Sequence, residues 1–250
     1  MVSRMKKTLI IDVGSHEAQE FQALFLNSTK NYFYNWIKHL NRVRRVGGEP
    51  CSLATFKNLL TNSRWLRTHR ESVHYVLVEP NIRLCAKPAY SHADQIANIA
   101  LAEEQDSLSV RKLYFAGNDA QGQGSSVFTE KPNVDVSSYD WVVSVDPKKF
   151  FDQLNQNIVK FYNSNIILRL NNEGAEVETI KAAHEVYGKK LVGIMGSLSD
   201  VEKVKGKSAM SELDRFIENI NVPFLPFSTD FATWPNAISF VREKIQLTSN

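Results

Sequence analysis

The chain has 250 residues, of which 43% are hydrophobic and 23% are charged, which is the composition of an ordinary globular protein. No apolar stretch approaches the ~20 residues of a membrane-spanning helix. The N-terminal apolar stretch TLII stops at Asp12, too early for a secretory signal. The two cysteines, Cys51 and Cys85, exclude a framework of several disulfides. These features predict a single domain over residues 1–250, with reduced thiols and a cytoplasmic location.

Positive charge is concentrated in one segment of the chain. Residues 28–70 hold nine basic residues and one acid, Glu49. The segment therefore carries a formal charge of +8, whereas the rest of the chain carries −5. Such asymmetry indicates an anionic partner or ligand, and a solvated helix face is the simpler alternative.

Short apolar stretches that alternate with helical patterns predict an α/β fold. Residues 8–13 predict a buried strand that ends in the turn Gly14-Ser15, and the apolar spacing over 17–26 predicts a helix. Further strands are expected at 75–79, 95–101, 110–115, 141–145, 165–170 and 191–195, with an edge strand at 222–227. Helices are expected at 177–187, 208–220 and 236–247. Strands that are apolar throughout are typical of a parallel sheet with helices on both faces.

The long interval between the first two predicted strands requires extra helices. The first strand ends near residue 13 and the second begins near residue 75, which is far more chain than a simple crossover needs. Ser28 or Thr29 is placed to cap one helix, and Ser52 is placed to cap a second. Residues 28–70 are therefore predicted to be a basic helical insertion after the first strand–helix unit. We expect it to flank the mouth of a ligand site.

Polar residues follow three predicted strands at the edge where parallel α/β sheets bind ligands. The first group is DVGSH at 12–16, where Gly14 lets the backbone approach a ligand closely. The second is Glu79, an acid that can accept hydrogen bonds from both hydroxyls of a ribose. The third is NNEGAE at 171–176. The single glycine of DVGSHEAQE argues against a pyrophosphate and favours a smaller nucleoside ligand.

Several of these motifs, in this order, resemble the FkbM-type S-adenosylmethionine-dependent methyltransferases over most of residues 8–200. The motifs are DVGSHEAQE, VLVEPN, NIALAEE, GSSVF, VVSVDPKKFF and ILRLNNEGAEVETIKAA. The family's first motif is approximately Asp-Val-Gly-Ala-Asn-x-Gly; Asp12 and Gly14 match it, and His16 stands for the asparagine. Its Glu-Pro-Asn motif matches residues 79–81. In its late motif Glu173 matches, whereas the positions of a lysine and an aspartate are occupied here by Arg169 and Asn171.

The resemblance implies a seven-stranded, Rossmann-like class I methyltransferase sheet with S-adenosylmethionine as cofactor. It also implies methyl transfer to a hydroxyl of a sugar, glycan or natural product, and the basic segment suggests an anionic or phosphorylated acceptor. The implied cofactor-binding residues are Asp12, Gly14, Ser15, Glu79, Pro80, Asn81, Ala100 and Leu101. The candidate catalytic residues at the acceptor are Glu173, His16 and Asn171. No histidine–cysteine–carboxylate spacing indicates a metal site.

Two alternative functions remain open at this level. Tyr32, Phe33, Tyr34 and Trp36 lie beside the basic residues, and such mixtures bind nucleic acid, so the chain could methylate RNA. The helical spacing of these aromatic residues suits core packing equally well. Because Arg169 and Asn171 depart from the family pattern, the other alternative is a non-catalytic module that binds the cofactor. Product formation would separate an enzyme from such a module.

Overall fold

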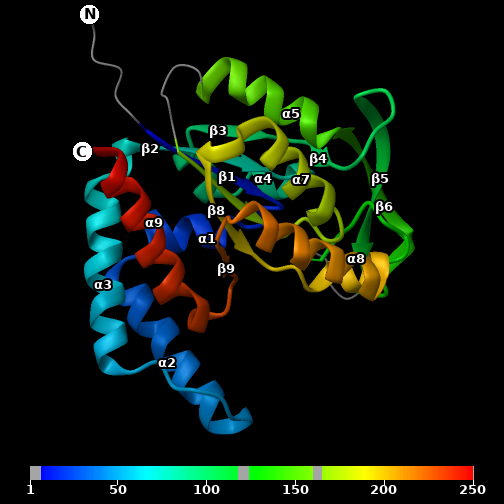
Figure 1. Cartoon of the computed structure of the whole chain (residues 1–250). Helices are drawn as coiled ribbons and strands as arrows, with labels where there is room; N and C mark the ends of the chain where they lie inside the picture. Colours follow the sequence, from blue (N-terminus) through cyan, green and yellow to red (C-terminus); the bar gives the residue numbers. More distant parts are fainter. Residues whose placement is uncertain (1–6, 118–123, 160–164, 250) are drawn as a thin grey trace, which may run out of the picture.

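The structure is a computed structural model that describes residues 7–117, 124–159 and 165–249 (Figure 1). Its centre is a six-stranded sheet in the order β3-β2-β1-β7-β8-β9, in which all neighbouring strands are parallel. These strands are β1 (Thr8–Val13), β2 (Val73–Val78), β3 (Gln95–Ala97), β7 (Ile166–Leu170), β8 (Leu191–Gly196) and β9 (Phe224–Pro226). The predicted α/β class is confirmed, and β9 is the edge strand expected at 222–227.

Helices cover both faces of this sheet, as predicted. One face carries α1 (Gln19–Phe21), its π-helical continuation Gln22–Leu26, α2 (Thr29–Val46), α3 (Leu53–Thr68) and α9 (Trp234–Ser249). The other carries α5 (Pro147–Leu154), its π-helical continuation Asn155–Val159, α7 (Glu176–Tyr187) and α8 (Ser199–Ile220). Within β1, Ile10 packs in the first layer, whereas Leu9 and Ile11 pack in the second. This alternation explains why all six residues of β1 are buried.

Short helical segments connect the larger elements. They are α4 (Ile82–Cys85) and the 3₁₀ turns Arg70–Ser72, Pro88–His92, Gly188–Lys190 and Phe231–Thr233. The last predicted helix before the edge strand begins earlier than expected, at Ser199 rather than residue 208. Gly206, with φ of 84°, interrupts it, and this kink separates a polar first part from the apolar pattern that the sequence shows.

A second, three-stranded sheet is a departure from the expected fold. It has the order β4-β6-β5, with β4 (Ala100–Leu101), β5 (Leu108–Ala116) and β6 (Val134–Val145). The strand expected at 95–101 is thus two strands in two sheets, and the strands expected at 110–115 and 141–145 form an antiparallel pair outside the central sheet. The described residues therefore do not form the single seven-stranded sheet that the resemblance implies. Because one face of this pair is solvated, Val110, Trp141 and Val143 are exposed.

The insertion between the first two strands is helical, as expected, and each helix begins at the predicted cap. Ser28 Oγ accepts from the Asn31 N–H at 3.2 Å, and Ser52 Oγ accepts from the Thr55 N–H at 3.1 Å. In Figure 1, α3 lies beside α9, while the end of α2 extends beyond the rest of the molecule. None of the helices in the described part of the chain is long and apolar enough to cross a membrane. Cys51 and Cys85 are both free thiols.

Candidate functional site

A cavity of about 830 Å³ lies where β1, β2 and β7 end, which is the edge that the sequence singles out. Its size is in the range of ~300–1,000 Å³ typical of small-molecule sites. One group of lining residues is apolar: Val13, Val78, Ile99, Ala100, Leu101 and Leu113. A second group is polar or charged: Lys131, Asn133, Asn171, Asn172, Glu173, Asp200, Lys203, Ser228 and Thr229. The cavity can therefore accommodate a ligand with one apolar and one polar part.

The turn after β1 approaches the turn after β7 so closely that only glycine fits. Gly14 has φ of +69°, and a Cβ there would lie 2.1 Å from the backbone oxygen of Asn171. Ser15 is fully buried, and its Oγ lies 2.9 Å from the Tyr90 hydroxyl, which donates to the carbonyl of His16 at 2.6 Å. Gly14 and His16 therefore line the cavity, whereas Ser15, predicted to contact the cofactor, anchors the turn from behind.

Asp12 is not placed at the cavity surface, although the resemblance assigns it to the cofactor. Its carboxylate is completely buried, with Oδ1 2.9 Å from Arg169 Nη1 and Oδ2 accepting from the Tyr75 hydroxyl at 3.0 Å. Burial raises the pKa of Asp12, and the Arg169 guanidinium opposes that rise. Asp12 thus supports Arg169, which lines the cavity itself.

Arg169 joins the ends of three chain segments beneath the cavity. Besides Asp12, its guanidinium donates to the carbonyl of Gly14 at 2.9 Å and to Glu20 Oε1. Glu20 lines the cavity, and its buried Oε2 has no hydrogen-bond partner. One arginine thus lies between two buried carboxyl groups, and burial raises the pKa of both Asp12 and Glu20. Glu20 is not among the residues predicted from the sequence, because only its position at the end of DVGSHEAQE distinguishes it.

Glu79 lies at the cavity wall at the end of β2, as predicted. Its carboxylate is 5% exposed and accepts from the backbone N–H of His16 and of Asn81, both at 2.8 Å. A carboxylate has about four acceptor positions, so two remain for a ligand. Burial raises the pKa of Glu79 to about 7. Asn81 itself is buried and caps α4, so its role is structural, whereas Pro80, Ala100 and Leu101 line the cavity.

The predicted acceptor residue Glu173 contacts Lys131, a residue for which the sequence predicts no role. Glu173 has φ of 59° and forms an ion pair with the buried Lys131. Asn171 Nδ2 lies 3.4 Å from Glu173 Oε1. Lys131 Nζ also donates to the carbonyl of Gly124 at 2.9 Å, and burial lowers its pKa. Ser126 Oγ donates to the carbonyl of Glu173 at 2.8 Å. No local pattern marks Lys131, because its partner lies 42 residues away.

The basic residues of the described cavity lining are paired, and the lining has more carboxyl groups than basic groups. The described lining residues include four carboxylates and three basic groups, with Asp12 buried behind them. Arg169 binds Glu20, Lys131 binds Glu173, and Lys203 Nζ lies 2.9 Å from Asp200 Oδ1. Each lysine and arginine among the described lining residues therefore already has a carboxylate partner. Such a cavity favours a cationic ligand over a phosphate group.

The basic insertion reaches the cavity only indirectly. Residues 28–70 contribute no lining residue among those described, but Arg42 Nη1 lies 2.7 Å from Asp230 Oδ2, and Asp230 follows the lining residues Ser228 and Thr229. Tyr32 is buried, with its hydroxyl bonded to the Ala23 carbonyl, and Trp36 is stacked on Phe56 with ring centroids 4.5 Å apart. Two of the four aromatic residues in the nucleic-acid alternative are therefore packing residues.

Comparison with known proteins leaves the family open. No family model matches the sequence, no curated protein matches it, and no solved structure matches the chain. The resemblance to FkbM-type methyltransferases therefore stays a prediction from the motifs. The described residues contain no group of three or more histidine, cysteine, aspartate or glutamate side chains arranged to hold a metal ion.

Proposed function

We propose that this protein is an S-adenosylmethionine-dependent O-methyltransferase that acts on a hydroxyl of a sugar, glycan or natural product. The observation that carries the proposal is the acidic cavity at the ends of β1, β2 and β7, with Glu79 at its wall and the orphaned Glu20 Oε2 buried at its lining. S-Adenosylmethionine has a sulfonium, an ammonium and a carboxylate, so its net charge is positive. The donor set of the cavity fits such a ligand.

The ribose, the adenine and the ammonium group of the cofactor each have a chemically suited group on the chain. The two unused acceptor positions of Glu79 would bind the ribose hydroxyls, as acids at this strand end do in nucleotide-binding folds. Ile99, Ala100 and Leu101 would pack against the adenine. Glu20 Oε2 would accept from the ammonium group. The cofactor, when bound, supplies an activated methyl group, and the chain's contribution is to align it with the acceptor oxygen.

Glu173 is the best-placed proton acceptor for the hydroxyl that is methylated. It lines the cavity, and its contacts with Lys131 and Asn171 hold its carboxylate in one position. The amide of Asn171 can orient the acceptor but cannot take its proton, and His16 lies on the same side as Glu79. Because the lining lysines and arginine are paired, a neutral hydroxyl-rich acceptor suits this cavity better than a phosphorylated one.

Calorimetric titration with S-adenosylmethionine tests the cofactor. We expect saturable binding that raises the melting temperature by mass action, and the absence of heat and of a melting shift at saturating cofactor would refute the proposal. Labelled cofactor with separate pools of glycans, lipids, RNA and small metabolites then identifies the acceptor. Binding without any labelled product would favour the non-catalytic module. Two observations support that alternative: Glu173 is already paired with Lys131, and Asn171 cannot act as a base.

Substitution of Glu173 tests whether this residue accepts the proton of the hydroxyl that is methylated. Glu173→Gln should lower kcat by roughly 10²–10⁴-fold, the usual contribution of general base catalysis, without weakening cofactor binding. The matched control is Glu178→Gln on α7, because Glu178 also pairs with a lysine, Lys205, but does not line the cavity. Equal activity of the two variants would exclude Glu173 as the base.

A further inference from the structure

The two inserted helices are the positively charged part of the molecule. Together α2 and α3 contain eight basic residues and no acidic residue. Seven of the eight are exposed: Lys30, Lys38, Arg42, Arg44, Arg45, Lys57 and Arg64. Since the chain outside residues 28–70 carries −5, the protein is electrically polarised. An anionic surface would attract these helices and repel the rest of the molecule, which gives the contact a defined orientation.

Apolar side chains lie between basic side chains on the outward side of α2. We call this side the outward arc. Its residues are spaced three, four or seven positions apart, so they share one face of the helix: Lys30, Phe33, Tyr34, Ile37, Asn41, Arg44 and Arg45. All seven are exposed, with Tyr34 at 67% and Phe33 at 51%. The buried Tyr32 and His39 lie on the opposite side of the helix. The outward arc is thus amphipathic in its own right. Phe33 also contacts the rings of Trp36 and Phe56, whereas the other six residues have no ion pair or ring contact within the described structure.

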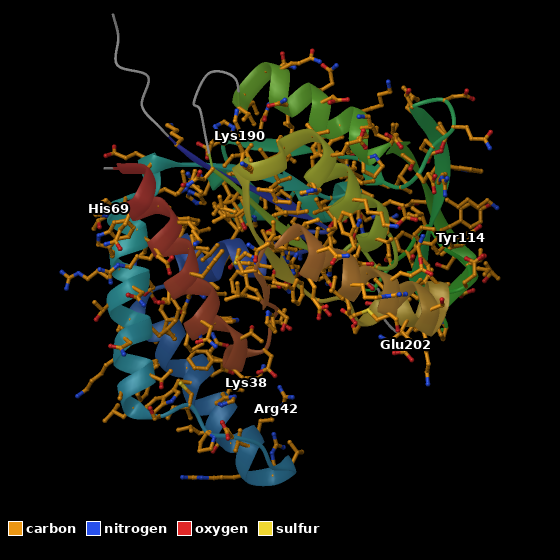
Figure 2. All side chains as sticks on the ribbon, in the orientation of Figure 1. Lys38, Arg42, His69, Tyr114, Lys190 and Glu202 are labelled. Atoms are coloured by element: carbon orange, nitrogen blue, oxygen red, sulfur yellow. The ribbon has the colours of Figure 1, made fainter. Side chains whose placement is uncertain are left out.

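The end of α2 stands clear of the two sheets. None of residues 41–50 is buried, and Val46 is 73% exposed. Figure 1 shows this end of α2 extending beyond α9, and Figure 2 places Lys38 and Arg42 on the same part of the helix. Leu53, which begins α3, is another large apolar residue left in solvent, at 55% exposure. A broad, flat partner can therefore reach the outward arc without meeting the rest of the protein.

We infer that the outward arc of α2 docks the protein on an anionic phospholipid surface. Helices that lie in the headgroup region combine basic residues with apolar side chains that enter the acyl boundary. Exposed aliphatic residues decide between lipid and nucleic acid, because Ile37, Val46 and Leu53 cannot stack on bases but gain from contact with acyl chains. The inference goes beyond the proposed function and does not depend on the cofactor.

Docking in this orientation would leave the cavity rim about one helix diameter from the lipid surface, because the Asp230 loop contacts α2 on the side of His39, opposite the outward arc. Arg42 connects α2 to Asp230, and the neighbouring Ser228 and Thr229 line the cavity. An acceptor carried by the lipid surface would have to extend past α2 to meet the polar side of the cavity. The cavity, whose basic residues are paired, would bind the hydroxyl-bearing part of such an acceptor. The basic residues of the outward arc would bind the anionic lipid surface.

Sedimentation with vesicles of 70% phosphatidylcholine and 30% phosphatidylserine tests the inference with the full chain. We expect binding that weakens as salt rises, and at least tenfold weaker binding to pure phosphatidylcholine vesicles. Each basic residue near such a surface contributes roughly fivefold to partitioning. Replacing Lys30, Lys38, Arg44 and Arg45 with Gln should therefore lower partitioning by at least about 100-fold. The matched control replaces four exposed lysines elsewhere with Gln: Lys149, Lys181, Lys189 and Lys190.

A second variant separates lipid from nucleic acid. Ile37→Ser should weaken vesicle binding severalfold while leaving the fold unchanged by circular dichroism, because Ile37 is 38% exposed. Three results would overturn the inference: no binding to the anionic vesicles, equal loss in the lysine control, or tighter binding to a 20-nucleotide RNA that Ile37→Ser leaves unchanged. Each of these can occur whether or not the protein binds S-adenosylmethionine.

Discussion

Arg169 Nη1 on β7 lies 2.9 Å from Asp12 Oδ1 on β1, and both side chains are at most 3% exposed. This contact joins the two central strands directly beneath the cavity, and the same guanidinium reaches Glu20 and the Gly14 carbonyl. Arg169 occupies a position that is a lysine in the family that the chain resembles, and its guanidinium can bind three partners at once. Arg169 therefore determines the shape of the cavity floor.

Removing the Arg169 charge should strongly destabilise the fold. In Arg169→Met two buried carboxylates lose their partner, and we expect a loss of about 3–5 kcal/mol in the free energy of unfolding. Arg169→Lys keeps one positive charge but not the fork of donors, so its loss should be smaller. Urea unfolding of the three proteins measures this order. Equal stability of Arg169→Met and wild type would show that the network does not contribute to stability.

Gly14→Ala should destabilise the fold more than the same substitution at Gly47, another glycine with positive φ. Both Gly14 (φ +69°) and Gly47 (φ +82°) have positive φ, and such conformations cost a side chain about 1–3 kcal/mol. At Gly14 the added Cβ would also lie 2.1 Å from the Asn171 oxygen, whereas nothing lies within 4 Å of a Cβ at Gly47. Thermal unfolding of Gly14→Ala and Gly47→Ala isolates the steric part. Similar melting temperatures would mean that the β1 and β7 turns separate at little cost.

Cofactor affinity should depend on pH through Glu79. Because burial raises the pKa of Glu79 to about 7, its carboxyl is increasingly protonated below that pH and accepts hydrogen bonds less well. Affinity for S-adenosylmethionine should therefore rise from pH 6 to pH 8. Glu79→Gln should remove this rise and lower affinity at pH 8 by about 10–100-fold, from roughly 1.5–3 kcal/mol per charged hydrogen bond. Glu185→Gln, at an exposed residue of α7, is the control for calorimetry.

Stability should depend on pH in the opposite direction through Glu176. Burial raises the pKa of this fully buried carboxyl from 4.5 to about 7, so the folded state prefers the protonated form. Its contribution to stability is complete below pH 4.5 and is lost as pH rises through 7. Glu176→Gln stays neutral, and its stability relative to wild type should rise by about 3 kcal/mol between pH 4 and pH 8. Urea unfolding at both pH values measures the change, and a constant difference would contradict the prediction.

Much of the fold follows from local patterns in the sequence. The fully apolar β1 predicts a strand buried on both faces, and the caps Ser28 and Ser52 predict where the inserted helices begin. Glu79 could be assigned to the cavity because it follows a buried strand, and the ends of parallel strands lie at one edge. Such features depend on neighbours along the chain, so the sequence contains the information directly.

The contacts that shape the site depend on residues far apart in sequence. Asp12 and Arg169 are 157 residues apart, and Lys131 and Glu173 are 42 apart, so no spacing rule relates them. The strands at 108–116 and 134–145 could not be excluded from the central sheet, because an isolated strand does not specify its partner. Sequence alone determined the elements, the charge of the insertion and the edge where a ligand would bind. Only tertiary packing decided which charged groups pair, and hence why Asp12 supports the cavity rather than lining it.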